Sequence, residues 1–405
     1  MRHLAGFALT WASVFLAIVA ILIGAPALFY ITTALIATIC GCHIQAYLAV
    51  RGLRLERVAP QSARVGDLIT IEISVWSLRK LKRTLVTVWD NLPPSLALSH
   101  RSPSLPIAPA FDQPVRTQYQ LRALKRGFFK WNGVSVTGTD ALGLISKSKA
   151  YETAPAEIIV YPRPLPVSLE LPSASGWGVN ESESGRTRGA GIELRGIREY
   201  RFGDSLRHIH WPSSARTGQL LVKEFEAGTQ AAAAFCIQRG KGTEIGHGAS
   251  TTLEQMCGNV AFLAETFLRQ GAYVFLPGLE DQPHYRADHD RVAEIYRTLA
   301  MVTSDGPRTL AYDVRQTVQM LNPGSVLYVM IAVAEPELPA SIATVAESGI
   351  KVVALLYDAL AFHKGRVRQE FLSAVDETFV SQLRAAGCIP VVIPTDVVDL
   401  EAVNS

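Results

Sequence analysis

The N-terminal fifty residues constrain this chain more than any other part of it. Two apolar runs, residues 4–24 and 27–50, contain no Lys, Arg, Asp or Glu. Each is long enough to cross the ~30 Å hydrocarbon core of a bilayer as a helix, which takes about 20 residues. Gly24-Ala25-Pro26 favours a tight turn between them, and the second apolar run argues against a cleaved signal peptide. The sequence therefore predicts a transmembrane hairpin over residues 1–50.

Positive charges flank this hairpin on one side only. Arg2 precedes the first run, Arg51, Arg54 and Arg57 follow the second, and the connecting loop has none. The positive-inside rule then places both ends in the cytoplasm. We expect a multi-pass protein of the inner (plasma) membrane, with the lipid bilayer as one partner and soluble domains facing the cytoplasm.

Charge and cysteine content exclude some classes of function. The formal net charge of the 405 residues is +3, which gives no general basic field, so nucleic acid is not an expected partner. The five cysteines lack the spacing of a disulfide framework, which favours buried, reduced thiols.

Residues 51–164 carry strand patterns. "DLITIEISVWS" alternates apolar and polar residues with period two, and "RTLVTVWD", "VRTQYQLRAL", "GFFKWNGVSVTGTD" and "EIIVYPRP" continue the pattern. The proline-rich "LPPSLALSHRSPSLPIAP" is expected to be a long loop between strands. Several short strands with turns between them predict a small antiparallel β-sandwich.

The C-terminal half has a different pattern. Residues 165–191 are rich in Ser, Gly and Glu and predict a flexible linker. Residues 192–228 form a charged segment, which we call the signature segment. Residues 229–405 alternate short apolar strands with amphipathic helices, and Thr251 and Asp288 are expected to begin two of these helices. This alternation predicts an α/β domain with a parallel sheet.

Ligands in such domains bind at the carboxyl ends of the strands. After the first strand, "QRGKGT" lacks the order of a phosphate-binding loop and has no carboxylates for a divalent cation. His284, Asp288, His289 and Asp290 could bind a metal, but acids at a helix start explain them better. No cofactor is expected.

The signature segment interleaves bases and acids. Such alternation favours a salt-bridged network over a groove for a polyanion. We expect Arg198, Asp204, Arg207 and Arg216 to form a buried or half-buried network around Trp211, with the exposed remainder forming a docking surface. The alternative function is a metal-dependent hydrolase that uses Asp204, His208 and His210, although spacing fixes no third ligand.

The same segment resembles the domain-of-unknown-function-58 family. Its pattern, Arg-Glu-Tyr-x-x-Gly-Asp-x-x-Arg-x-Ile-x-Trp-x-x-Ser-Ala-Arg and then Val-Lys-x-Phe-Glu, is matched here by Arg198, Glu199, Tyr200, Gly203, Asp204, Arg207, Ile209, Trp211, Ser214, Ala215, Arg216, Val222, Lys223, Phe225 and Glu226. The stretches "TDALGLI" and "IIVYPRP" also resemble the family. His210 stands where the family usually has Asp or Asn.

The resemblance implies a membrane-anchored scaffold or adaptor with a C-terminal domain similar to a von Willebrand factor A domain. It implies a MoxR-type AAA+ ATPase as partner, and in some cases a transglutaminase-like membrane protein. Metal-binding von Willebrand A domains carry Asp-x-Ser-x-Ser after their first strand, whereas this chain has Gln238, Gly240 and Gly242. We therefore expect no metal ligands and no catalytic residues, and we assign the matching residues to structure and interaction.

Overall fold

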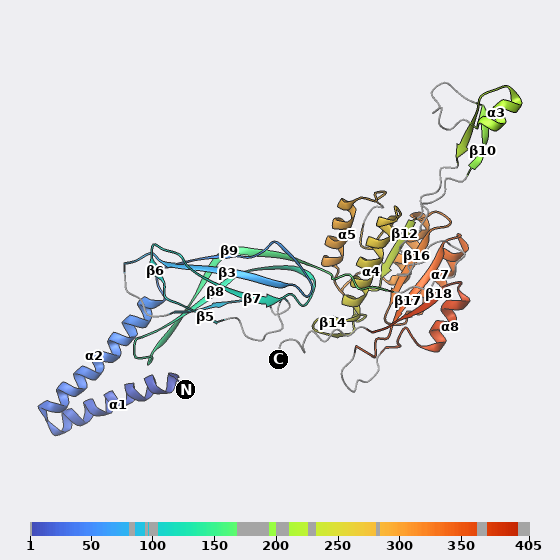
Figure 1. Cartoon of the computed structure of the whole chain (residues 1–405). Helices are drawn as coiled ribbons and strands as arrows, with labels where there is room; N and C mark the ends of the chain where they lie inside the picture. The colour runs from blue at the N-terminus through green and yellow to red at the C-terminus, as the bar shows by residue number, and fades with distance from the viewer. Residues whose placement is uncertain are drawn as a thin grey trace. The chain divides into compact units, whose positions relative to one another are not determined.

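The structure is a computed structural model that describes residues 2–80, 86–93, 96, 104–167, 194–199, 210–225, 232–280, 284–362 and 371–395 (Figure 1). The chain divides into two compact units, Met1–Tyr161 and Pro162–Ser405.

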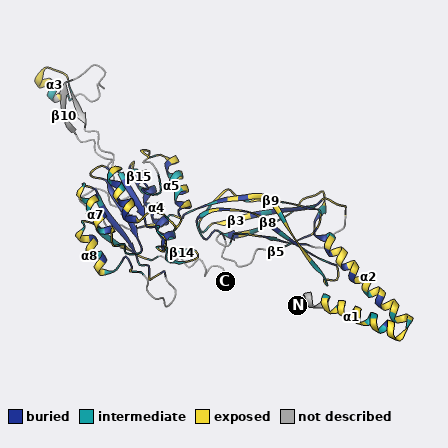
Figure 2. Ribbon diagram, turned by 180° about the vertical axis from the view of Figure 1, so that it is seen from behind, coloured by how far each residue is buried: buried dark blue, intermediate teal, exposed yellow. Residues whose placement is uncertain are grey.

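The first unit begins with two apolar helices, α1 (Arg2–Ile23) and α2 (Pro26–Ala49), which are long and apolar enough to cross a membrane. Gly24 makes the turn with a φ of +67°, a conformation that favours glycine. Proline at the start of α2 suits the helix because its missing N–H would have no helical partner. Figure 2 shows both helices largely exposed, and such an apolar surface requires a cover. The two predicted helices are thus confirmed.

The rest of the first unit consists of two sheets. One has four strands: β1 (Leu53–Val58), β3 (Leu68–Ser77), β6 (Ala110–Phe111) and β7 (Val115–Arg122). The other has five, in the order β2 (Ser62–Arg64), β9 (Ser146–Tyr161), β8 (Gly127–Thr139), β4 (Val86–Asp90) and β5 (Ser104–Ile107). The pairs are antiparallel except β2–β9 and β3–β6, which are parallel. Part of the predicted proline-rich loop forms the strand β5. This strand can contain Pro106 because it lies at the edge of the sheet.

One hydrophobic core serves both sheets. Ile71 and Ile73 of β3 and Val136 and Ile158 of the five-stranded sheet are fully buried members of one cluster. The period-two alternation of the sequence is the cause, because alternate side chains of a strand point to one face. Ala49 at the end of α2 joins the same cluster.

Arg57 has a different place from the one that its charge suggested. It was expected among the positive residues flanking the hairpin, but its side chain is fully buried against Asp90. Arg51 and Arg54 remain exposed. Of the three arginines that follow the hairpin, Arg51 and Arg54 therefore provide the exposed positive charge.

The second unit contains a five-stranded parallel sheet with the order β15 (Tyr273–Phe275), β12 (Ala232–Ile237), β16 (Val326–Ile331), β17 (Lys351–Tyr357) and β18 (Ile389–Ile393). The described helices that follow β12 in the chain are α4 (Thr252–Arg269), α5 (His289–Met301), α6 (Leu310–Gln316), the short 3₁₀ helix η4 (Thr317–Gln319), α7 (Leu338–Glu347) and α8 (Glu377–Ala385). A small ribbon, β13 (Gly246–His247) and β14 (Ser250–Thr251), precedes α4. The predicted parallel sheet is confirmed.

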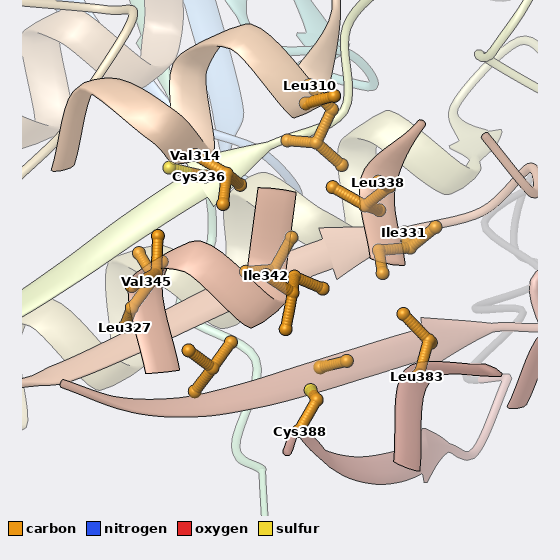
Figure 3. Close-up of a cluster of buried hydrophobic side chains, with 14 of the residues drawn as sticks. Cys236, Leu310, Val314, Leu327, Ile331, Leu338, Ile342, Val345, Leu383 and Cys388 are labelled. Atoms are coloured by element: carbon orange, nitrogen blue, oxygen red, sulfur yellow. The ribbon is translucent and has the colours of Figure 1, made fainter. Parts of the chain in front are cut away.

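Central strands of this sheet are buried along their length, as the continuous apolar runs predict. Figure 3 shows Cys236, Val314, Ile342 and Leu383 converging from strands and helices on one cluster. The predicted helix starts also form: the Thr251 side chain accepts a hydrogen bond from the amide of Glu254, and Asp288 accepts one from the amide of Arg291.

The predicted linker begins too early at residue 165. The backbone of Leu165 is bonded to α4: its amide donates to the Gly258 carbonyl (3.0 Å), and its carbonyl accepts from the side-chain amide of Asn259 (3.0 Å). Val167 is buried. Residues 168–191 of the predicted linker lie outside the described part of the chain.

Candidate functional site at the carboxyl end of the parallel sheet

The strand order identifies where a ligand would bind in the α/β domain. β12, the first strand of the sheet in the chain, lies between the second, β15, and the third, β16. At such a switch point the connections leave to opposite sides and open a crevice at the carboxyl ends of the strands. The chain leaves β12 there as Gln238-Arg239-Gly240.

Gln238 is a structural residue at this point. Its side-chain amide donates to the Val333 carbonyl (2.8 Å), and its Oε1 accepts from the amides of Ala332 and Val333 (2.9 Å each). All three bonds go to residues that directly follow β16. Gln238 therefore connects β12 to β16 past the last backbone pair of these two strands. The side chain is buried and its hydrogen-bonding capacity is largely used.

Arg239 extends toward the loop after β15 and toward α6. Its guanidinium donates to the Gly278 carbonyl and lies 4.0 Å from Oδ2 of Asp313. The Arg239 side chain is 16% exposed and that of Asp313 is 4% exposed. Arg239 thus presents donors at the surface with a buried carboxylate behind it.

Asp313 is an incompletely satisfied acid. Its Oδ1 is buried and has no hydrogen-bond partner. Burial raises the pKa of Asp313 above its usual range, although Arg239 and Arg308 oppose the shift, while Glu335 adds to it. Glycine is required at 278, because a Cβ there would lie 2.2 Å from Oδ2 of Asp313. The site therefore combines an accessible cation with a buried acceptor that has spare capacity.

This arrangement suits the binding of a polar group from a partner. Glu335 is occupied, since its Oε1 accepts from the amide of Ala311 at the start of α6 (3.1 Å). Among the described residues no group of three or more His, Cys, Asp or Glu could hold a metal ion. Sequence reasoning considered Gln238, Gly240 and Gly242 here but missed Arg239 and Asp313. The available clue was an acid on the core-facing side of α6, a helix that we did not predict.

The signature segment is described only in part. Arg198 and Glu199 lie on β10 (Leu194–Glu199), and Lys223 and Phe225 on β11 (Leu221–Phe225), two antiparallel strands in which Arg198 faces Val222. Trp211, Ser214, Ala215 and Arg216 lie on the intervening helix α3 (Trp211–Thr217). The predicted residues outside the described part are Tyr200, Gly203, Asp204, Arg207, Ile209 and Glu226.

The expectation of a buried network around Trp211 is wrong for Trp211 itself. Its side chain is 64% exposed, and Arg216 is also exposed. Ser214 on the same helix is buried. Its hydroxyl donates to the His210 carbonyl (3.0 Å) and accepts from the amide of Leu221 (2.9 Å), which ties α3 to β11.

His210 has a local structural role. Its Nδ1 accepts from the amide of Ser213 (3.3 Å) and lies 2.8 Å from the Ser213 hydroxyl, so His210 is the N-cap of α3. Asp and Asn are strong N-caps, and the histidine nitrogen fills that role here. Of the alternative metal site, Asp204 and His208 lie outside the described residues.

The other candidate metal cluster, at residues 284–290, also has a structural explanation. Asp288 caps α5, and Arg286 binds both Asp288 (2.8 Å) and Asp290 (3.4 Å). Hydrogen bonds from the Arg291 amide and from Arg286 lower the pKa of Asp288. These contacts are those of a helix start, as expected.

Comparison with known proteins supports the family resemblance. Residues 196–328 match the family model described as "Protein of unknown function DUF58". The chain is also 26% identical over 165 residues to the uncharacterized protein YeaD of Bacillus subtilis (strain 168). That match covers 40% of this chain and 41% of the relative's length. Both matches support the DUF58 family, which the signature segment indicated.

Solved structures show only weak likeness. The CARDB domain of PF1109 from Pyrococcus furiosus is 10% identical, with a TM-score of 0.18, over 25% of this chain and 94% of that domain. A β-glucosidase from Listeria innocua is 13% identical, with a TM-score of 0.15, over 25% of this chain and 16% of the enzyme. Likenesses with TM-scores this low identify no common fold.

Proposed function

We propose that this chain is a membrane-anchored scaffold or adaptor that works with a MoxR-type AAA+ ATPase in envelope or complex assembly. The two apolar helices would hold it in the inner membrane, with both soluble units in the cytoplasm. In this proposal the first unit is a β-sandwich and the second a von Willebrand A-like domain. A transglutaminase-like membrane protein is a further possible partner.

The exposed Trp211 is the observation that carries the proposal. Trp211 is 64% exposed on a short helix, and a partner that covered it would remove a large apolar surface from water. Arg216 on the same helix is also exposed, as is Leu220, which lies between α3 and β11. Trp and Arg are the residues that most often dominate the binding energy of protein interfaces. The family signature therefore includes a surface with the composition of a docking site.

Arg239 and Asp313 add a second contact point on the α/β domain. Their site lies where a parallel sheet normally receives its ligand, and it offers the partly exposed guanidinium of Arg239. A carboxylate or other acceptor of the partner could bind the partly exposed guanidinium of Arg239, which the buried carboxylate of Asp313 helps to position.

Affinity capture from native membranes tests the proposal. The tagged full chain should retain a MoxR-type ATPase, quantified by mass spectrometry. Trp211→Ala should reduce its recovery by about tenfold or more, since loss of a hot-spot residue costs about 2 kcal/mol or more. Phe128→Ala is the matched control, because Phe128 is a 45% exposed aromatic on β8 of the other unit.

Three results would contradict the proposal. They are the absence of the ATPase from the wild-type capture, equal loss with both variants, and no loss with Trp211→Ala. Stoichiometric zinc or manganese in the purified full chain would favour the alternative hydrolase.

A further inference from the structure

The turn between β8 and β9 is an ordered loop of residues 140–145, which we call the Asp140 loop. Asp140 is buried and organises it: its carboxylate accepts from the amides of Leu142 (3.0 Å) and Ile145 (2.7 Å). Gly143 takes a φ of +70° and donates to the Asp140 carbonyl (3.1 Å). The loop therefore has one fixed shape, with the side chain of Leu142 projecting from it.

This loop contacts both apolar helices. Oε1 of Gln45 on α2 accepts from the amide of Ala141 (3.1 Å), and Cys42, one turn earlier, hydrogen-bonds to Asp140. On α1, a Cβ added to Gly6 would lie 2.7 Å from the Leu144 carbonyl oxygen. Only glycine permits this approach, so the loop lies against the start of α1 and the last turns of α2 (Figure 1).

These contacts fix the depth of the loop relative to a bilayer. Cys42 and Gln45 precede the end of α2 at Ala49 by one to two turns, or about 6–10 Å at 1.5 Å per residue. The 24 residues of α2 span about 36 Å, whereas the hydrocarbon core is about 30 Å thick. When the hydrocarbon core begins at Pro26, it ends about 6 Å before Ala49, at the height of Gln45, and the Asp140 loop then lies where acyl chains meet headgroups.

Its composition suits that level. Leu142 is 63% exposed at the tip of the loop. Lys147 and Lys149 follow on β9, both exposed and two residues apart, so they lie on one face of the strand. Arg51, at the end of α2, is exposed and lies over the ring of Tyr47 (4.1 Å), an interfacial aromatic–cation pair. An apolar tip is thus bordered by cations.

We propose that the Asp140 loop is a third membrane contact, in which Leu142 inserts among the acyl chains and Arg51, Lys147 and Lys149 bind anionic lipid headgroups. The inference rests on the proposed membrane insertion of α1 and α2. It gives the first unit a fixed orientation on the bilayer, because three contacts determine a plane where a two-helix anchor alone would allow tilting.

Fluorescence quenching in nanodiscs with anionic lipid tests this contact. Leu142→Cys in the full chain with Cys40→Ser would carry an environment-sensitive dye, and lipids with a nitroxide near the headgroup would quench it. We expect a blue-shifted emission that is mostly quenched. The Cys40→Ser parent should take up no label, since the other cysteines are buried.

Leu68→Cys in the same background is the matched control. Leu68 is 60% exposed, but it begins β3 at the end opposite Ser77, which pairs with Leu53 next to the membrane helices. Its dye should be neither shifted nor quenched. If the dye at 142 behaved like that at 68, the proposed contact would be wrong.

Labelling the native Cys40 separates this inference from the membrane anchor. Cys40 is exposed on α2, roughly 14 Å before its end, and should be quenched by nitroxides deep in the bilayer. Quenching at Cys40 without quenching at 142 would overturn the loop contact alone. A lack of quenching at Cys40 would overturn both the anchor and the loop contact.

Discussion

Each unit contains an arginine paired with a buried aspartate, and the two pairs differ in how completely their hydrogen bonds are satisfied. In the first unit, Arg57 and Asp90 are both fully buried and form a two-pronged contact, with Nε of Arg57 3.0 Å from Oδ2. The remaining donors of Arg57 reach the carbonyls of Trp131 and Gly133 and the hydroxyl of Thr153. Tyr119 donates a further bond to Asp90 (2.6 Å).

The pair in the second unit is open by comparison. Arg239 and Asp313 are 4.0 Å apart, Oδ1 of Asp313 has no partner, and Arg239 is partly exposed. A buried charge with unmet bonding capacity costs free energy, while a complete network is rigid. The difference indicates that Arg57–Asp90 holds the two sheets in register, whereas Arg239–Asp313 is positioned to bind something else.

Removing Arg57 should have the largest effect. Arg57→Ala leaves Asp90 buried and unpaired, so the opening free energy of β3, β4 and β8 should fall by about 3–5 kcal/mol. Amide hydrogen exchange of the full chain in nanodiscs measures it. The control is Lys130→Ala, because the pair of Lys130 with Glu157 is exposed and should contribute about 0–1 kcal/mol. Equal effects would mean that the buried network is not the main tie between the sheets.

Replacing Asp140, another buried aspartate with several hydrogen bonds, should lower local stability by an intermediate amount. Burial alone would raise its pKa, but hydrogen bonds from Ile145, Cys42 and Leu142 lower it overall. The stability that its charge provides is therefore full above the ordinary aspartate pKa of about 3.9 and is lost as pH falls through the lower folded value. Asp140→Asn should cost about 1.5–3 kcal/mol locally, since it removes hydrogen bonds to a charged group.

Amide exchange of residues 141–145, corrected for intrinsic rates, measures this loss against pH. Protection in the wild type should decline toward acid, and the Asn variant should be less protected at neutral pH with a flatter profile. A variant as protected as the wild type at neutral pH would show that the charge does not hold the loop.

Asp313→Asn should change the free energy of unfolding least of the three, and it should raise this free energy where the other two substitutions lower it. The folded pKa of Asp313 is raised, so the wild type binds its proton more tightly when folded and loses stability as pH rises from about 3.9 through the folded value. The neutral variant avoids that loss. At neutral pH it should unfold with a free energy equal to the wild type or about 0–1 kcal/mol higher.

Urea unfolding of the second unit in the full chain, followed by exchange in β12 and β16, checks this sign. A loss of several kcal/mol would place Arg239–Asp313 in the same structural class as Arg57–Asp90. It would then remove the site from consideration as a binding surface.

Sequence patterns predicted most of the elements but little of the candidate site. The strand starting at Leu68, the helix starting after Asp288 and the alternation in residues 229–405 are local patterns, and each was found where expected. Arg239 and Asp313 were missed because they lie 74 positions apart in the chain and meet only through the strand order. Trp211 was expected at the centre of a buried or half-buried charged network, yet its side chain on α3 is exposed.

The sequence by itself determined the two apolar helices, the strands of the first unit, the parallel sheet of the second and the helix caps at Thr251 and Asp288, since hydrophobic period and capping act between residues a few positions apart. Only the tertiary structure decided that the Arg57 side chain is buried against Asp90 rather than exposed beside the membrane. It also decided that β12 lies between β15 and β16 and that the Asp140 loop contacts α1 and α2. Those contacts depend on sheet register and strand order, which bring together residues far apart in the chain.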